Sequence, residues 1–275
     1  MVNLLSGGLH ARGGFALQDL LIIPRTADSY PHALEIVWDI RTALESLVVA
    51  RGERPLVADE GGFAPAVDGL DEAFDLIETA IRQAGYTPDR SEIAMAIDVA
   101  ATHFYDPETE QYDIEGEQLV PPDMIDTVLD WAARYPILSI EDPLVDTDWD
   151  GWETITDRLD DEIQVLGDDL LVSNVDRCRR AHETAAANAV LVKPNQAGTI
   201  SRAVDVIEAA GNCSMNTVVS ARSGETCDST IADLAVGLDA GQIKIGSLAR
   251  SERLAKYNRL LEIDRQHDAE LADPF

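Results

Sequence analysis

The chain has 275 residues, 45% of them hydrophobic, which is enough for one large α/β barrel or two ordinary domains. Its formal net charge of −30 argues against nucleic acid and against anionic membrane surfaces as partners, because both require clustered lysine and arginine side chains. The N-terminus has neither a basic leader nor an apolar stretch long enough for a signal peptide or a membrane span, so we expect a cytoplasmic protein.

Lysine is nearly absent from the chain. Three lysines, Lys193, Lys244 and Lys256, and 18 arginines make up the 21 basic residues. Acid excess with so few lysines is typical of a halophilic protein, because high salt screens the repulsion between surface carboxylates. Against this background, Lys193 and Lys244 indicate a function, with a buried structural amine as the alternative. The three cysteines are odd in number and widely spaced, which predicts reduced thiols.

Helical periodicity is clear at residues 71–84, and Gly85 follows as a stop signal. Beyond it, helical segments alternate with short apolar runs typical of strands. The helical segments are 123–135, 174–187, 199–211 and 226–241, and the apolar runs include 137–143, 189–195, 217–225 and 242–247. This alternation predicts parallel strands covered by helices. The most polar stretch, 102–119, is expected to form a hairpin or excursion beside the barrel.

Five apolar runs end in a charged residue. These residues are Asp98, Glu141, Asp168, Lys193 and Lys244. A closed parallel barrel gathers the carboxyl ends of its strands at one mouth. An open doubly wound sheet has the same alternation, but it usually carries the phosphate-binding turn G-x-G-x-x-G, which this sequence lacks. We therefore expect an α/β fold with a TIM-type (β/α)8-like barrel, forming one domain over residues 1–275.

The charged strand ends suit proton transfer assisted by Mg²⁺. Asp98, Glu141 and Asp168 can supply the oxygen ligands that this ion prefers, although a single acid at a strand end is more often a cap or a solvated charge. Burial disfavours the ammonium form of a lysine. One of Lys193 and Lys244 can therefore remove a proton while the other stabilises negative charge, and the sequence alone does not assign the two roles.

Two loops carry further candidate groups. Residues 57–65 place Glu60 before two glycines, so this acid is either presented over the barrel mouth or part of an ordinary strand-to-helix turn. Arg222 lies beside Ser223 after another strand, and a guanidinium next to a hydroxyl suits an anionic group such as phosphate. A surface salt bridge is the alternative for Arg222.

Taken together, these segments resemble the barrel domain of the enolase family. The ordered series covers nearly the whole chain and includes NLLSGGLHA, DEGGFAP, AIDVAATHFYD, SIEDP, GDDLLVSN, LVKPNQAGTISRA, VVSARSGET and RSERLAKYN. The resemblance implies a Mg²⁺-dependent lyase that interconverts 2-phosphoglycerate and phosphoenolpyruvate in glycolysis. The metal ligands that it implies are Asp98, Glu141 and Asp168.

The resemblance also implies roles for individual residues. Lys193 removes the proton at carbon 2, Glu60 is the general acid for the hydroxyl leaving carbon 3, and Lys244 stabilises the enediolate together with the metal. The C–H group at carbon 2 is a very weak acid, so it loses its proton only if cations stabilise the negative charge that forms on the substrate. The substrate-binding residues implied are His10, Asp19, Arg222, Ser223 and Lys244.

Departures from the family pattern leave alternatives open. The chain begins almost at the first barrel strand, so we expect the family's N-terminal domain, with its mobile lid and its part in holding a second magnesium ion, to be absent. Ala221 replaces a histidine, and Asp19 replaces a glutamate that is one methylene longer. These changes favour a catalytically impaired barrel that acts as a binding or scaffold subunit. An enolase-superfamily enzyme acting on another carboxylate is a further alternative.

The retained charges favour an active enzyme, because a silent barrel has no physical need of five converging charges that reduce its stability. We therefore expect a lyase whose substrate is a small phosphorylated carboxylate. A homo-oligomer, or a complex with a separately encoded N-terminal domain, is an open possibility.

Overall fold

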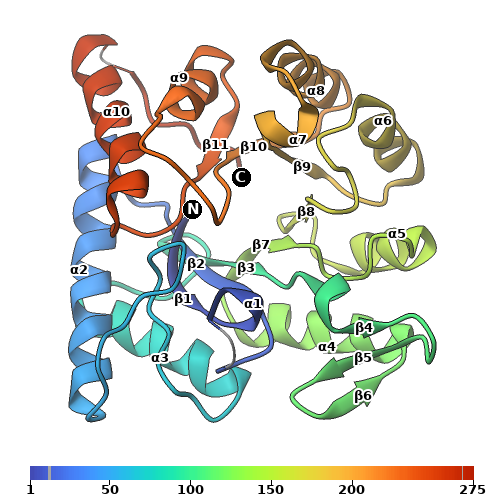
Figure 1. Ribbon diagram of the computed structural model, residues 1–275, viewed down its shortest axis with the longest axis horizontal. Helices are drawn as coiled ribbons and strands as arrows, with labels where there is room; N and C mark the ends of the chain where they lie inside the picture. The colour runs from blue at the N-terminus through green and yellow to red at the C-terminus, as the bar shows by residue number, and fades with distance from the viewer. Residues whose placement is uncertain (12–13, 268) are drawn as a thin grey trace.

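The computed structural model describes residues 1–11, 14–267 and 269–275 (Figure 1). Eight strands form one sheet, and in spatial order they are β1 (Val2–Ser6), β2 (Asp19–Pro24), β3 (Ile93–Asp98), β7 (Ile137–Glu141), β8 (Gln164–Gly167), β9 (Ala189–Val192), β10 (Asn216–Ser220) and β11 (Gly241–Lys244). The backbone N–H of Asn3 donates to the carbonyl of Gly246, 3.2 Å away, which links the first strand to the end of the last. The sheet therefore curls on itself, and the predicted α/β barrel is confirmed.

Helices surround the strands, as Figure 1 shows. They are α1 (Gly8–Ala11), α2 (Tyr30–Ala50), α3 (Leu70–Gln83), α4 (Pro121–Arg134), α5 (Trp149–Arg158), α6 (Val175–Thr184), α7 (Pro194–Ala197), α8 (Ile200–Asn212), α9 (Thr230–Gly237) and α10 (Ser251–His267). Capping residues define several starts: the side chains of Asn174 and Thr199 accept backbone N–H groups at the first turns of α6 and α8. In α3 the apolar residues all lie on the buried face, which confirms the helix predicted over 71–84.

The first part of the barrel differs from the regular alternation. β2 is antiparallel to both β1 and β3, whereas the pairs from β3 to β11 are parallel. A parallel crossover needs a helix long enough to return along the sheet, and α1, between β1 and β2, has four residues. The chain therefore reverses direction here, which the strand pattern of the later segments did not predict.

Residues 102–119 form a small sheet beside the barrel, as expected. Its antiparallel strands are β4 (Tyr105–Asp106), β5 (Gln111–Ile114) and β6 (Glu117–Leu119), preceded by the short 3₁₀ helix η1 (Ala101–Phe104). Tyr112 anchors this sheet, because its buried hydroxyl accepts the backbone N–H of Val145 at 3.1 Å. The predicted excursion is confirmed.

The barrel strands are buried along almost their whole length, which fits a parallel sheet covered by helices. The carboxyl ends of six neighbouring strands, β3 and β7 to β11, meet at one mouth, and this arrangement brings distant charged residues together. Within the described ranges, no helix combines the length and the apolar character needed to cross a bilayer.

Candidate functional site

A cavity of about 320 Å³ opens at the carboxyl ends of the strands, and we call it the upper cavity. Nine of the ten residues predicted to act line it: His10, Glu60, Asp98, Glu141, Asp168, Lys193, Arg222, Ser223 and Lys244. The tenth, Asp19, is fully buried behind His10 and does not line the cavity. The barrel thus brings together side chains that are up to 234 positions apart in the chain, from His10 to Lys244.

The ammonium group of Lys244 lies between two carboxylates. Its Nζ donates to Asp98 Oδ2 at 2.7 Å and to Glu141 Oε2 at 2.6 Å, and all three residues are buried. Burial alone would lower the pKa of Lys244, but the charges of Asp98 and Glu141 outweigh it and raise that pKa well above its usual value. Burial, together with the nearby charge of Asp98, raises the pKa of Glu141, while the charge of Lys244 opposes this shift. Lys244 is therefore held as a cation.

Lys193 forms the second ion pair of the site. It directly follows β9, and its Nζ donates to Asp168 Oδ2. The other carboxylate oxygen, Asp168 Oδ1, is buried without a hydrogen-bond partner among the described residues. Asp168, which lines the same cavity as Lys193, therefore keeps one oxygen that can still accept a hydrogen bond or bind a cation.

Asp142 and Asp169, which the strand-end pattern did not indicate, line the upper cavity as well. Asp142 has left-handed backbone geometry (φ 45°) and accepts the backbone N–H groups of Asp168 and Asp169 at 3.0 and 2.8 Å. Burial and the charge of Asp168 raise the pKa of Asp142 well above its usual value. Each missed acid is the second of an acidic pair in the sequence, and this doubling was the available signal.

Glu60 lies in the loop between α2 and α3 and lines the same cavity. Only 6% of Glu60 is exposed, and its carboxylate accepts no hydrogen bond from a described residue. Burial and the charge of Asp19 raise its pKa, which favours the protonated, proton-donating form. Gly62 allows this loop to approach β1, because a Cβ at that position would lie 2.4 Å from the side-chain oxygen of Asn3.

Asp19 orients His10. Its Oδ1 accepts from Asn3 at 2.5 Å and from Ser6 at 2.7 Å, while its Oδ2 lies 2.8 Å from His10 Nδ1. Burial acts to lower the pKa of His10, but the hydrogen bond and charge of Asp19 outweigh it and raise that pKa. A carboxylate on one ring nitrogen leaves the other nitrogen of His10 free to act in the cavity.

Arg222 and Ser223 form the exposed side of the cavity, directly after β10. Arg222 forms no ion pair with any described residue, so the salt bridge considered as an alternative is not seen there. A guanidinium without a carboxylate partner beside a hydroxyl keeps its donors available for an incoming anion. Ala221, at the base of the same segment, is buried and gives the cavity a small apolar wall.

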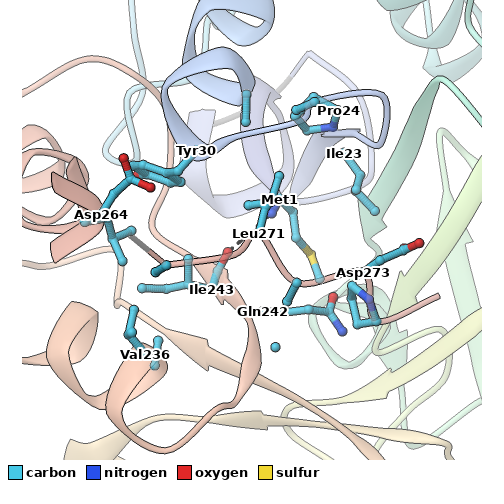
Figure 2. Close-up of a pocket in the computed structure, with 18 of the residues that line it drawn as sticks. Met1, Ile23, Pro24, Tyr30, Val236, Gln242, Ile243, Asp264, Leu271 and Asp273 are labelled. Carbon is cyan, nitrogen blue, oxygen red and sulfur yellow. Dashed lines mark hydrogen bonds between the residues drawn. The ribbon is translucent and has the colours of Figure 1, made fainter. Parts of the chain in front are cut away.

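A second, larger cavity of about 430 Å³ lies near the opposite ends of the strands, and we call it the lower cavity (Figure 2). It is lined mainly by apolar side chains such as Ile23, Ile243 and Leu271, the last from the C-terminal segment. That segment is fastened by Arg25, which pairs with Asp273 at 3.0 Å. No lysine is among the described residues that line the lower cavity, so it has no lysine–carboxylate pair of the kind found in the upper one, and we place the candidate site in the upper cavity.

The upper cavity fits a hard divalent cation. Asp98 and Glu141 already converge on one positive charge, the ammonium of Lys244, and Asp168 Oδ1 is a buried oxygen without a partner. All these donors are carboxylate oxygens, which suit Mg²⁺. Two sets of three residues could each hold a metal ion, because the ligand atoms within each set lie within 4.8 Å of one another. One set is His10, Asp19 and Glu60, and the other is Asp142, Asp168 and Asp169. The predicted set of Asp98, Glu141 and Asp168 is not one of these groups: Lys244 bonds to the first two, and Lys193 bonds to the third.

Comparison with known families gives an independent result. The family model described as the enolase C-terminal TIM barrel domain matches residues 1–272. The match covers almost all of the chain, and its description as a TIM barrel agrees with the curled sheet. The chain therefore belongs to the enolase C-terminal TIM barrel family.

Proposed function

We propose that this protein is a Mg²⁺-dependent lyase that interconverts 2-phosphoglycerate and phosphoenolpyruvate. Family membership indicates the coarser function, an enolase-superfamily enzyme of the lyase type. The observation that carries the finer proposal is the alternation of buried carboxylates and ammonium groups around one cavity. Such a set can remove a proton next to a carboxylate and hold the negative charge that results.

Lys193 is the proposed base. Its amine lines the same cavity as Glu60, so a substrate bound there would meet a proton acceptor and a proton donor from two different segments of the chain. Lys244 remains a cation because two carboxylates hold it, and it would stabilise charge on the substrate carboxylate. The two lysines therefore have different proposed roles because their surroundings differ.

Glu60 is the proposed general acid. Its raised pKa keeps a proton available for the hydroxyl that leaves carbon 3, and the water-poor surroundings strengthen the transfer. Arg222 and Ser223 would bind the phosphate at the exposed rim. Magnesium held by Asp98, Glu141 and Asp168 would add positive charge beside the substrate carboxylate.

A second candidate rests on Ala221. This buried position gives the cavity a small apolar wall where a hydrogen-bonding side chain would contact a polar substrate. A related carboxylate with an apolar substituent would fit such a wall, and the same proton-abstraction step would act on it.

The proposal is tested by following phosphoenolpyruvate absorbance with 2-phosphoglycerate, Mg²⁺ and molar KCl. We expect turnover by the wild-type protein and a loss of about 10³-fold or more in Lys193→Ala, the range for a general base. Leu271→Ala, in the lower cavity, is the matched control and should keep wild-type turnover. Equal rates in wild type and Lys193→Ala would remove the proposal for the isolated chain. A panel of related carboxylates then tests the second candidate.

A further inference from the structure

Arg253 is a fully buried cation on α10 that lies outside the upper cavity. It has no exposed surface, and no described carboxylate forms an ion pair with it. Its guanidinium donates instead to three backbone carbonyls: Ile245 at 2.9 Å, Ser223 at 2.7 Å and Asp59 at 3.4 Å. Burying a charge without a counter-charge is costly, and Arg253 Nε has no hydrogen-bond partner among the residues that the structure describes. A side chain retained at this cost calls for a role beyond packing.

The three carbonyls belong to three segments that carry candidate site residues. Asp59 precedes Glu60, Ile245 follows Lys244, and Ser223 is itself part of the proposed phosphate site. We propose that Arg253 is a positioning residue that fixes the Glu60 loop relative to the Arg222–Ser223 loop. This inference rests on the proposed function and deepens it, because it assigns how the proton donor and the anion site are held at a set separation.

Close packing supports the proposal. Gly246 has a positive φ of 112°, and a Cβ there would lie 2.6 Å from the Glu60 carbonyl and 3.1 Å from Arg253 Cδ. The Glu60 carbonyl also accepts the backbone N–H of Ser247 at 2.8 Å. The Glu60 loop is therefore pressed against the segment after β11, at the point where Arg253 joins both.

Lys256, one turn further along α10, holds one loop only. Its Nζ donates to the Thr226 carbonyl at 2.7 Å and pairs with Glu225 at 2.8 Å. Glu225 in turn accepts the backbone N–H of Arg222 at 3.1 Å. The polar contacts of Lys256 thus reach the Arg222–Ser223 loop, which we call the anion loop, and none of those found among the described residues reaches the Glu60 loop. Lys256 therefore serves as an internal comparison for Arg253.

The chemistry explains why the position is occupied by arginine. A guanidinium offers five N–H donors in a planar fork, so one side chain can reach several carbonyls in different directions. A lysine ammonium is a compact charge on a flexible stem and cannot span the same separation. Arg253→Lys keeps the charge and removes the fork, and it therefore separates the positioning role from the effect of charge.

The test is hydrogen exchange by mass spectrometry on the full chain, which does not depend on the reaction. We expect Arg253→Lys to accelerate exchange at least tenfold in peptides covering residues 58–63 and 221–227, with peptides from β9 unchanged. Lys256→Met should accelerate exchange in 221–227 alone. Tyr257→Phe, which removes a buried hydrogen bond to Gly246 O from the same helix, is the matched control and should leave both peptides unchanged. Arg253→Gln replaces Arg253→Lys if the latter does not fold.

Unchanged exchange in either peptide, or a rise spread over the whole chain, would overturn the positioning role. A second experiment measures kcat and KM of Arg253→Lys for 2-phosphoglycerate. Misplacement of the two loops should lower kcat/KM by about 10- to 100-fold, with a fall in kcat as well as a rise in KM. A change in KM alone would mean that Arg253 serves the anion loop only and would overturn the link to Glu60. If the wild type is inactive, the proposed function fails, whereas the exchange result still decides the inference.

Discussion

The upper and lower cavities are built at opposite ends of the same strands from opposite kinds of side chain. The lower cavity is the larger, yet it is lined mainly by apolar residues, whereas the upper one holds buried carboxylates paired with ammonium groups. Removing charges from water is costly even when they are paired, so this arrangement lowers stability at one end of the barrel. The difference teaches that the chemistry of the lining, and not the volume of the cavity, identifies the candidate functional end.

The largest expected effect comes from Lys244→Met. This change leaves the carboxylates of Asp98 and Glu141 buried side by side without a cation, which should cost about 3–5 kcal/mol in the free energy of unfolding. Urea denaturation in EDTA measures the loss. Adding Mg²⁺ should stabilise the variant more than the wild type, because the ion would replace the missing charge. Equal gains from Mg²⁺ in both proteins would contradict the proposed cation site.

A gain of activity is expected from Ala221→His. The imidazole would add a hydrogen-bond donor to the apolar wall of the upper cavity, and one good hydrogen bond to substrate corresponds to about 1.5 kcal/mol, or about tenfold in kcat/KM. The phosphoenolpyruvate assay measures it. A lower rate with 2-phosphoglycerate would indicate that the cavity is shaped for a different carboxylate, in line with the second candidate.

Glu60→Gln should stabilise the fold while removing activity. The folded protein favours protonated Glu60, since its pKa is raised above the usual 4.5, so stability is lost as the pH rises from that value through the folded pKa. Glutamine removes this loss, and we expect a gain of about 1 kcal/mol at pH 8, or about 2 °C in Tm, but no gain at pH 4. Thermal unfolding at the two pH values measures the gain in stability. A gain that is larger at pH 4 than at pH 8 would contradict the raised pKa of Glu60.

The smallest effect is expected in the lower cavity. Leu271 is 40% exposed, so Leu271→Ala should change the free energy of unfolding by no more than about 0.5 kcal/mol and leave turnover unchanged. Urea denaturation and the phosphoenolpyruvate assay measure the two quantities. A marked loss of turnover would mean that the lower cavity is coupled to the chemistry, and the contrast between the two ends would fail.

Much of the site could be predicted because its residues follow apolar runs. Asp98, Glu141 and Lys193 each end or follow a buried strand, and strand ends meet at one mouth in a barrel. The excursion at 102–119 was also visible, because its polar composition interrupts the alternation of helices and strands. These features depend on local pattern and on one general property of the fold.

Other features depend on contacts that no local pattern encodes. The antiparallel β2 depends on how the short α1 turns the chain, and the role of Asp142 depends on a left-handed backbone angle that places its carboxylate on two amides. Nothing in the sequence alone reveals the surroundings of Lys256. In the structure it is a buried amine that donates to two backbone carbonyls. The contacts of Arg253 join segments almost 200 positions apart, which only the folded chain shows.

The most direct test of the central claim is the exchange of the carbon 2 proton of 2-phosphoglycerate in D₂O, followed by NMR with Mg²⁺ and molar KCl. In the proposed mechanism, Lys193 removes the proton before the hydroxyl leaves, so exchange reports on the base even where overall turnover is slow. We predict exchange with the wild-type protein and none above background with Lys193→Ala. Absence of exchange in the wild type, or equal exchange in both, would contradict the account.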